Sequence, residues 1–218
     1  DLLVVVGCDT GKSGLVQFEE LVEPITSTFE DWTIRVKPPE QRPAKVLLLL
    51  HGWTGDETSM WFFARNLSKS FWLIAPRAPY PAPQGGFSWR PLSSDSTHPA
   101  RYEQLRPSAA MLLDLIDRWG IANAVDVGQV DIMGFSQGAA MSLTFALTCP
   151  KRVCKIGTLA GFPPRDIDSL VESRRLDGKS VFVTHGTGDE LVPIDMAKQT
   201  LGILEKAGAR VTYCEADV

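Results

Sequence analysis

Long hydrophobic runs are absent from this chain of 218 residues, in which no uninterrupted apolar run exceeds the five residues of Val46 to Leu50. A membrane-spanning helix needs about 20 such residues, so we expect no integral membrane segment. An excess of positive charge is also absent, since the formal net charge is -4. An acidic surface does not attract phosphate backbones, and we therefore expect no nucleic-acid partner.

Cysteine pairs at metal-binding spacing are absent as well. The four cysteines, Cys8, Cys149, Cys154 and Cys214, form no C-x-x-C motif and have no histidine at the spacing of metal ligands. This distribution favours reduced structural thiols in a cytoplasmic protein without a metal site. Both ends of the sequence look cut, so whether a signal sequence precedes Asp1 stays open at this point.

A phosphate-binding loop is suggested near the start of the chain, but its spacing does not fit. Gly11, Lys12 and Ser13 follow an apolar run, yet only three residues separate Gly7 from Gly11, one fewer than the motif requires. The run that follows contains Pro24 and is a poor candidate for the helix that would hold a phosphate. We interpret these residues as a glycine turn between short strands and expect no cofactor.

What the chain does contain is an alternation of short β-rich runs with longer helical ones, which is typical of a parallel β/α fold. The predicted strands cover residues 32–36, 46–50, 71–75, 130–133, 153–159, 181–184 and 211–214. The predicted helices cover residues 58–67, 105–116, the run after Ser136, and 196–206. No repeat or linker interrupts this pattern, so we expect a single domain over residues 1–218. Residues 79–101 form a loop rich in proline and aromatics that we expect to lie over the active site.

The clearest motif is GFSQG, which places Ser136 between Gly134 and Gly138, after a predicted strand and before a predicted helix. In α/β-hydrolases the nucleophilic serine lies on such a sharp turn, where side chains two residues away would collide with neighbouring chain. The amino end of the helix also favours developing negative charge. We predict that Ser136 is a nucleophile; the alternative is a helix N-cap serine in a glycine-lined turn.

Two further turns support this interpretation. The run VLLLLHGWTGDE places a turn directly after a buried strand, where the fold supplies one amide of the oxyanion hole. The two predicted oxyanion amides are the N–H groups of Trp53 and Gln137. The run VFVTHGTGDELVP carries Asp189 in a loop after a later strand, where the fold places the acid of the catalytic triad. Glu190 is the rival acid, and a solvent-facing loop carboxylate is the alternative for either residue.

Taken together, LLLHGWTGDE, APRAPY, GGFSWRP, GFSQGAAMSL and HGTGDELVP resemble the phospholipase/carboxylesterase family of α/β-hydrolases, which includes the acyl-protein thioesterases. The resemblance runs from about Val46 to the end of the chain. It implies a mostly parallel central sheet with helices on both faces, and a serine hydrolase that cleaves carboxylic esters, or thioesters, without cofactor or metal. Trp53 stands where a small or aliphatic residue is common in the family, so we expect a narrowed acyl pocket. Phe87, Trp89 and Phe162 are further predicted substrate-binding walls, with an ordinary core role as the alternative for each.

A histidine after the acid is missing from the sequence. All three histidines, His51, His98 and His185, precede Asp189, whereas the fold requires the base to follow the acid. We interpret His51 as a structural hydrogen-bonding residue and His98 as a loop residue, and the family counterpart of His185 is structural. Family members place a Gly-His pair about where VTYCEADV ends, followed by a final helix. We therefore expect the catalytic histidine and that helix just beyond Val218; a pseudoenzyme that has lost the base is the alternative.

The predicted function is hydrolysis of small-to-medium acyl esters, either small molecules or lipid-like, through an acyl-enzyme on Ser136. An acyl-protein thioesterase or another thioesterase would share every catalytic residue and is one alternative. A non-catalytic module that binds acyl ligands is the other. The sequence leaves the oligomeric state open.

Overall fold

The central sheet of the molecule has eight strands, in the order β1-β2-β4-β3-β7-β8-β9-β10. The computed structural model describes residues 23–91, 99–189 and 194–217. The strands of the sheet are β1 (Ile25–Phe29), β2 (Trp32–Lys37), β3 (Lys45–Leu50), β4 (Phe71–Pro76), β7 (Val130–Phe135), β8 (Val153–Leu159), β9 (Ser180–Gly186) and β10 (Arg210–Ala216). A separate two-stranded hairpin is formed by β5 (Tyr80–Pro81) and β6 (Phe87–Ser88).

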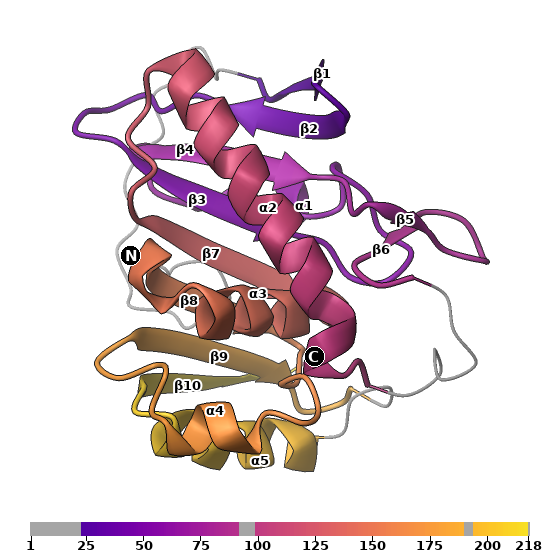
Figure 1. Ribbon diagram of the computed structural model, residues 1–218, viewed down its shortest axis with the longest axis vertical. Helices are drawn as coiled ribbons and strands as arrows, with labels where there is room; N and C mark the ends of the chain where they lie inside the picture. The colour runs from indigo at the N-terminus through magenta and orange to yellow at the C-terminus, as the bar shows by residue number, and fades with distance from the viewer. Residues whose placement is uncertain (1–22, 92–98, 190–193, 218) are drawn as a thin grey trace.

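Six neighbouring strands of the sheet, β4, β3, β7, β8, β9 and β10, are parallel. At one edge, β2 is antiparallel to both β4 and β1. The carboxyl ends of the parallel strands therefore meet along one side of the sheet, where open α/β sheets bind their ligands. The β5–β6 hairpin lies on this side (Figure 1). This arrangement confirms the predicted α/β class with a mostly parallel sheet.

Helices cover the sheet as the sequence pattern predicts. Their bounds are α1 (Trp61–Ala64), α2 (Tyr102–Asn123), α3 (Gln137–Thr148), α4 (Asp168–Glu172) and α5 (Ile194–Lys206), with a short 3₁₀ turn at Pro150–Arg152. Figure 1 shows α2, α3, α4 and α5 in front of the sheet. The side chains of Trp61 and Phe63 in α1 pack against a second, smaller core on the opposite face.

Strand β3 is apolar along its whole length because both faces of the sheet are covered there. Val46, Leu48 and Leu50 belong to the core under α2 and α3, while Leu47 and Leu49 belong to the core under α1. All five are at most 1% exposed, because side chains alternate between two covered faces. A strand that is buried on both faces is expected to have a continuous apolar run, as Val46 to Leu50 does.

Two predicted elements differ from the structure, and strand β1 and helix α4 were not predicted from the sequence. The predicted helix over residues 58–67 is reduced to α1, because Asp56 accepts hydrogen bonds from the N–H and hydroxyl of Thr58 and from the hydroxyl of Ser59, which holds this stretch in turns. The loop predicted over residues 79–101 contains the β5–β6 hairpin, and residues 92–98 of it lie outside the described residues.

The thiols require one correction. Cys149 and Cys154 are free, but Cys214 in β10 is disulfide-bonded, so the expectation of four reduced thiols is wrong. Cys8 and the glycine turn at residues 7–13 lie outside the described residues. Among the helices of the described residues, none has the length and apolar character that crossing a membrane requires.

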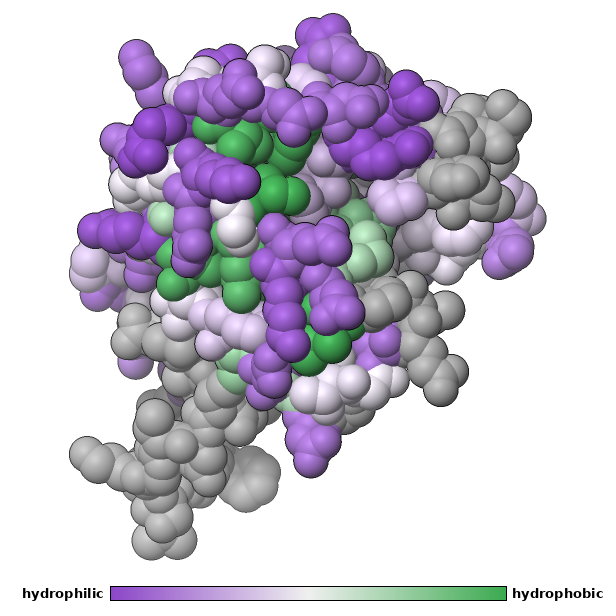
Figure 2. Space-filling model, turned by 90° about the horizontal axis from the view of Figure 1, so that it is seen from below, coloured by the Kyte–Doolittle hydropathy of each residue, from purple (hydrophilic) through white to green (hydrophobic). Residues whose placement is uncertain are grey.

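Apolar side chains reach the surface at the end of the molecule that carries α4 and α5. Figure 2, which views this end from below, shows apolar patches separated by polar and charged residues. Val171, Leu201 and Ile203 are partly buried there against the main core. Divided patches of this kind are normal for a globular surface, and we assign no site to this end.

Candidate active site

Ser136 occupies a strained turn between β7 and α3. Its backbone has φ 52° and ψ -114°, a conformation that residues with a Cβ rarely adopt. The turn is held by the Ser136 N–H, which donates to the carbonyl of Leu159 over 3.0 Å. Strain of this kind persists only where surrounding structure enforces it, and it is concentrated at functional sites.

The two glycines that flank Ser136 are required by close backbone contacts. A Cβ at Gly134 would lie 2.0 Å from the carbonyl oxygen of Gly138, and one at Gly138 would lie 2.1 Å from the carbonyl oxygen of Leu50. No side chain fits at either distance. The structure thus supplies the physical reason for the spacing of the GFSQG motif.

The turn after β3 lies directly against the serine. A Cβ at Gly52 would lie 3.4 Å from the Cβ of Ser136. Among the described residues, no hydrogen bond is found for the N–H of Trp53, although the next two N–H groups, of Thr54 and Gly55, are both bonded. The N–H of Gln137 opens α3, and the first N–H groups of a helix have no partner within it. The two predicted oxyanion amides therefore belong to adjacent turns.

The β5–β6 hairpin is hydrogen-bonded to the turn after β3 that contains Trp53, Thr54 and Gly55. The Thr54 N–H donates to the carbonyl of Phe87 over 3.0 Å, and the Phe87 N–H donates to the carbonyl of Gly55 over 2.9 Å. The Arg77 guanidinium lies over the Phe87 ring, 4.6 Å from its centroid, and forms two hydrogen bonds of 2.7 and 2.9 Å with Glu57. These bonds hold the pKa of Glu57 below its usual value. The hairpin is thus an ordered wall beside the serine.

The other side chains predicted to line the acyl pocket differ in their exposure to solvent. Trp53 is 41% exposed, whereas Trp89 is fully buried. Phe162 is partly buried against the main core, just after Gly161, whose Cβ would lie 3.3 Å from the carbonyl oxygen of Ser136. Contact of these side chains with a substrate stays a prediction.

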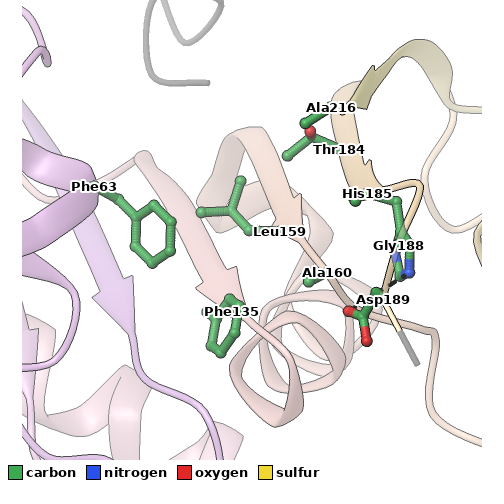
Figure 3. Close-up of a pocket in the computed structure, with 10 residues that line it drawn as sticks. Phe63, Phe135, Leu159, Ala160, Thr184, His185, Gly188, Asp189 and Ala216 are labelled. Carbon is green, nitrogen blue, oxygen red and sulfur yellow. Dashed lines mark ion pairs between the residues drawn. The ribbon is translucent and has the colours of Figure 1, made fainter. Parts of the chain in front are cut away.

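Asp189 lies in a hollow of about 370 Å³ at the carboxyl ends of the strands. Figure 3 shows Phe63 and Phe135 on one side of it and His185, Gly188 and Asp189 on the other. The complete lining is Phe63, Phe135, Leu159, Ala160, Thr184, His185, Gly186, Gly188, Asp189 and Ala216. The lining thus includes Phe135, the residue before Ser136, but not Ser136 itself.

The sequence did not predict several residues of this hollow. The GFSQG motif assigns no role to Phe135, although alternation along β7 turns its side chain to the opposite face from Ile132. Thr184 is 4% exposed, and its hydroxyl has no hydrogen-bond partner among the described residues. Ala216 lies at the end of β10. No motif distinguishes these three residues, because only the fold brings them together.

The two described histidines are both buried. His51 donates from Nδ1 to the carbonyl of Gly52 over 2.7 Å and accepts at Nε2 from the N–H of Ala78 over 3.0 Å. Burial lowers its pKa, which keeps the imidazole neutral. His185 has Nε2 3.8 Å from Oδ2 of Asp189, and its Nδ1 is shielded from solvent. His98 and the rival acid Glu190 lie outside the described residues.

The chain is similar to known proteins over most of its length. The sequence profile of a family described as phospholipase/carboxylesterase matches residues 33–216. Acyl-protein thioesterase 1 from Kluyveromyces lactis is 30% identical over 189 residues, which cover 79% of this chain and 82% of that protein. Acyl-protein thioesterase 1 from Debaryomyces hansenii is 28% identical and covers 77% of this chain and 79% of that protein.

Solved structures share the fold. A carboxylesterase from Mesorhizobium loti superposes with a TM-score of 0.76 at 21% identity, over 89% of this chain and 90% of that one. The Bacillus cereus carboxylesterase superposes with a TM-score of 0.73 at 22% identity, over 86% of this chain and 85% of that one. At these identities the structures establish the architecture.

Proposed function

Because the chain belongs to the phospholipase/carboxylesterase family, and is thus a serine hydrolase with the α/β-hydrolase fold, we propose that it cleaves carboxylic esters through an acyl-enzyme on Ser136. The observation that carries the proposal is the turn at Ser136. A strained serine stands there between two glycines that cannot carry a side chain, at the amino end of α3 and against the turn that ends in Trp53. That combination is what nucleophilic attack and oxyanion stabilisation need.

The proposed mechanism has two covalent steps. The Ser136 Oγ attacks the acyl carbon while its proton passes to a histidine, and the carbonyl oxygen becomes an oxyanion bound by the N–H groups of Trp53 and Gln137. When the intermediate collapses, the histidine gives the proton to the leaving alcohol or thiol. Water, activated by the same histidine, then hydrolyses the acyl-enzyme and frees Ser136. Asp189 orients the histidine throughout.

We place the histidine in the chain that follows β10. Support comes from the hollow beside Asp189, because Ala216 at the end of β10 lines it together with the acid and Phe135. A residue entering from β10 would meet the carboxylate of Asp189 on one side and Phe135, the residue before Ser136, on the other. His51 is hydrogen-bonded at both ring nitrogens, and His185 is buried with its Nε2 3.8 Å from Oδ2 of Asp189, so we assign neither histidine as the base.

Labelling with a fluorophosphonate tests the nucleophile and the base together. The protein used should continue past Val218 so that any histidine there is included. We expect rapid labelling and hydrolysis of an aryl acyl ester, both lost when a histidine beyond Val218 is changed to Gln. The matched variant His185→Gln should keep the labelling. A well-folded extended chain that neither labels nor hydrolyses the ester would refute the proposed function.

Small-to-medium acyl groups are the proposed substrates. Trp53 adds an indole at the mouth of the site, and the hairpin residue Phe87 is fixed close to it by backbone bonds. Hydrolysis rates for a series of acyl lengths, each as oxyester and thioester of the same acid, test this choice. A kcat/KM that peaks at short acyl groups supports it. Equal or higher rates for long acyl thioesters would instead favour the protein thioesterase function that the yeast relatives carry in their names.

A cytoplasmic location is also proposed, and the thiols provide its test. The free thiols of Cys149 and Cys154 agree with a reducing compartment, whereas the disulfide of Cys214 favours an oxidising one. Alkylation of thiols in freshly lysed cells, followed by mass spectrometry, reads the state of each cysteine. Reduced Cys214 in the cell supports the cytoplasm, and oxidised Cys214 would overturn it.

A further inference from the structure

We propose that Trp89 is a positioning residue that sets the distance between the two oxyanion amides, although it is fully buried and does not line the hollow beside Asp189. The inference rests on the proposed function, because it takes the N–H groups of Trp53 and Gln137 as the oxyanion donors. It assigns to Trp89 a role other than that of a substrate-binding wall.

Trp89 is bonded to both turns that carry those amides. Its indole Nε1 donates to the carbonyl of His51 over 2.8 Å, one residue before Gly52 in the oxyanion turn. Its backbone N–H donates to the side-chain Oε1 of Gln137 over 3.0 Å. Trp89 therefore joins the turn after β3 to the first residue of α3. Moving Trp89 would move the N–H of Trp53 relative to the N–H of Gln137.

The two anchoring points of Trp89 are themselves held in place. The His51 ring packs against the indole with centroids 5.3 Å apart, and both of its nitrogens are hydrogen-bonded. The Gln137 Nε2 donates to the hydroxyl of Ser88 over 3.2 Å. The carbonyl of Trp89 accepts from the buried hydroxyl of Ser108 in α2 over 2.7 Å, so a long helix supports the link from behind.

Direct contact between the turns does not by itself fix the donors. Gly138 approaches the carbonyls of Leu50 and His51 so closely that a Cβ would lie 2.1 and 2.6 Å from their oxygens. This contact limits how closely α3 approaches β3, but it does not stop the two turns from sliding past each other. Because Trp89 is hydrogen-bonded to both turns beside the contact, it restrains that sliding. A displacement of about 1 Å at a catalytic donor costs on the order of 100-fold in rate.

The test compares Trp89→Phe with a matched variant, Trp72→Phe. Trp72 packs against Trp119, and its buried indole N–H has no hydrogen-bond partner among the described residues. Both variants lose the same volume and one indole N–H. The active sites of each protein are counted by fluorophosphonate titration, and kcat and KM are then measured with an aryl ester. The affinity for an alkyl boronic acid, whose adduct with serine imitates the tetrahedral intermediate, is measured alongside.

We expect Trp89→Phe to lower kcat per titrated site by about 10- to 100-fold, with KM within about threefold and boronate affinity falling in parallel. Trp72→Phe should lower the melting temperature but leave kcat per site unchanged. If Trp89→Phe keeps the wild-type kcat per site while the wild type labels and turns over, this inference is overturned and the proposed function stands. A wild type without turnover overturns both.

A second variant decides the matter if Trp89→Phe does not fold. Gln137→Met keeps the backbone N–H of the oxyanion hole and a side chain of similar length but removes the bonds to Trp89 and Ser88. It should also lower kcat per site, by about 10-fold. In the double variant the two losses should not add, because both changes break one link. An unchanged kcat in Gln137→Met would contradict the positioning role.

Discussion

The two halves of the candidate active site are built differently. The nucleophile half rests on β3 and β7 in the middle of the sheet, where β3 pairs with a strand on each side and its apolar residues are buried. The acid half rests on β9 and on β10, an edge strand whose residues are all at least partly exposed. Backbone contacts hold Ser136 in one position. Asp189 lies in the loop after β9, where Nε2 of His185 is 3.8 Å from its Oδ2. The proposed oxyanion donors therefore belong to turns held by buried strands in the middle of the sheet, whereas the proposed acid lies towards an edge of it.

Removal of the nucleophile should have the largest effect. Ser136→Ala should lower kcat by at least about 10⁵-fold, because no other group can form the acyl-enzyme. Ser142→Ala is the matched variant, since Ser142 lies on α3 as well and its buried hydroxyl only donates to the carbonyl of Gly138. That change should lower the free energy of unfolding by about 1 kcal/mol and leave kcat nearly unchanged. Steady-state kinetics on both variants check the prediction, and residual turnover near wild type in Ser136→Ala would contradict it.

Substitution of the proposed acid should lower kcat less than removal of the nucleophile. Asp189→Asn should lower kcat by about 10³- to 10⁴-fold, because the acid orients the base without touching the reacting atoms. Glu190→Gln, the rival acid, should leave kcat close to wild type. Kinetics of the two variants side by side distinguish them, and the reverse ranking would move the acid to Glu190.

Two glycines, one in the nucleophile half and one on α5, sharpen the comparison through stability. Gly138→Ala places a Cβ 2.1 Å from the carbonyl oxygen of Leu50 and should lower the free energy of unfolding by about 3 kcal/mol, with loss of activity. Gly202→Ala in α5 meets nothing within 4 Å and should raise it by about 0.5 to 1 kcal/mol, because alanine favours the helix. Urea unfolding measures both. Equal effects would mean that the contacts at Gly138 do not constrain the nucleophile turn.

The pH dependence of stability reports on His51. Burial lowers its pKa from the usual 6.5, so below pH 6.5 the unfolded chain binds a proton that the native state does not. The free energy of unfolding should therefore fall as the pH drops from 7 to 5.5, by at most about 1.4 kcal/mol per pH unit for this group. His51→Asn should flatten this slope. Glu57 adds no slope in this window, because its lowered pKa lies below the usual 4.5. An unchanged slope in His51→Asn would show that His51 is not the titrating group.

Local sequence patterns were sufficient to predict seven of the eight strands of the sheet and the turn at Ser136, because these features are encoded over short distances. The apolar run before GFSQG and the glycines in it are consequences of strand burial and backbone contact. The bond from Trp89 to His51 joins residues 38 positions apart, and no pattern encodes it. The hollow beside Asp189 combines α1, β7, β8, β9 and β10, so its aromatic lining follows only from the topology. The disulfide of Cys214 was missed because isolated cysteines give no pairing signal.

Trapping of the covalent intermediate tests the central claim most directly. The chain continued past Val218 is mixed briefly with an activated acyl ester, quenched in acid, digested and mapped by mass spectrometry. The account predicts one acyl group per molecule, on the peptide that contains Ser136, and its loss in Ser136→Ala. An acyl group on a different residue, or ester hydrolysis without any acylated peptide, would contradict it.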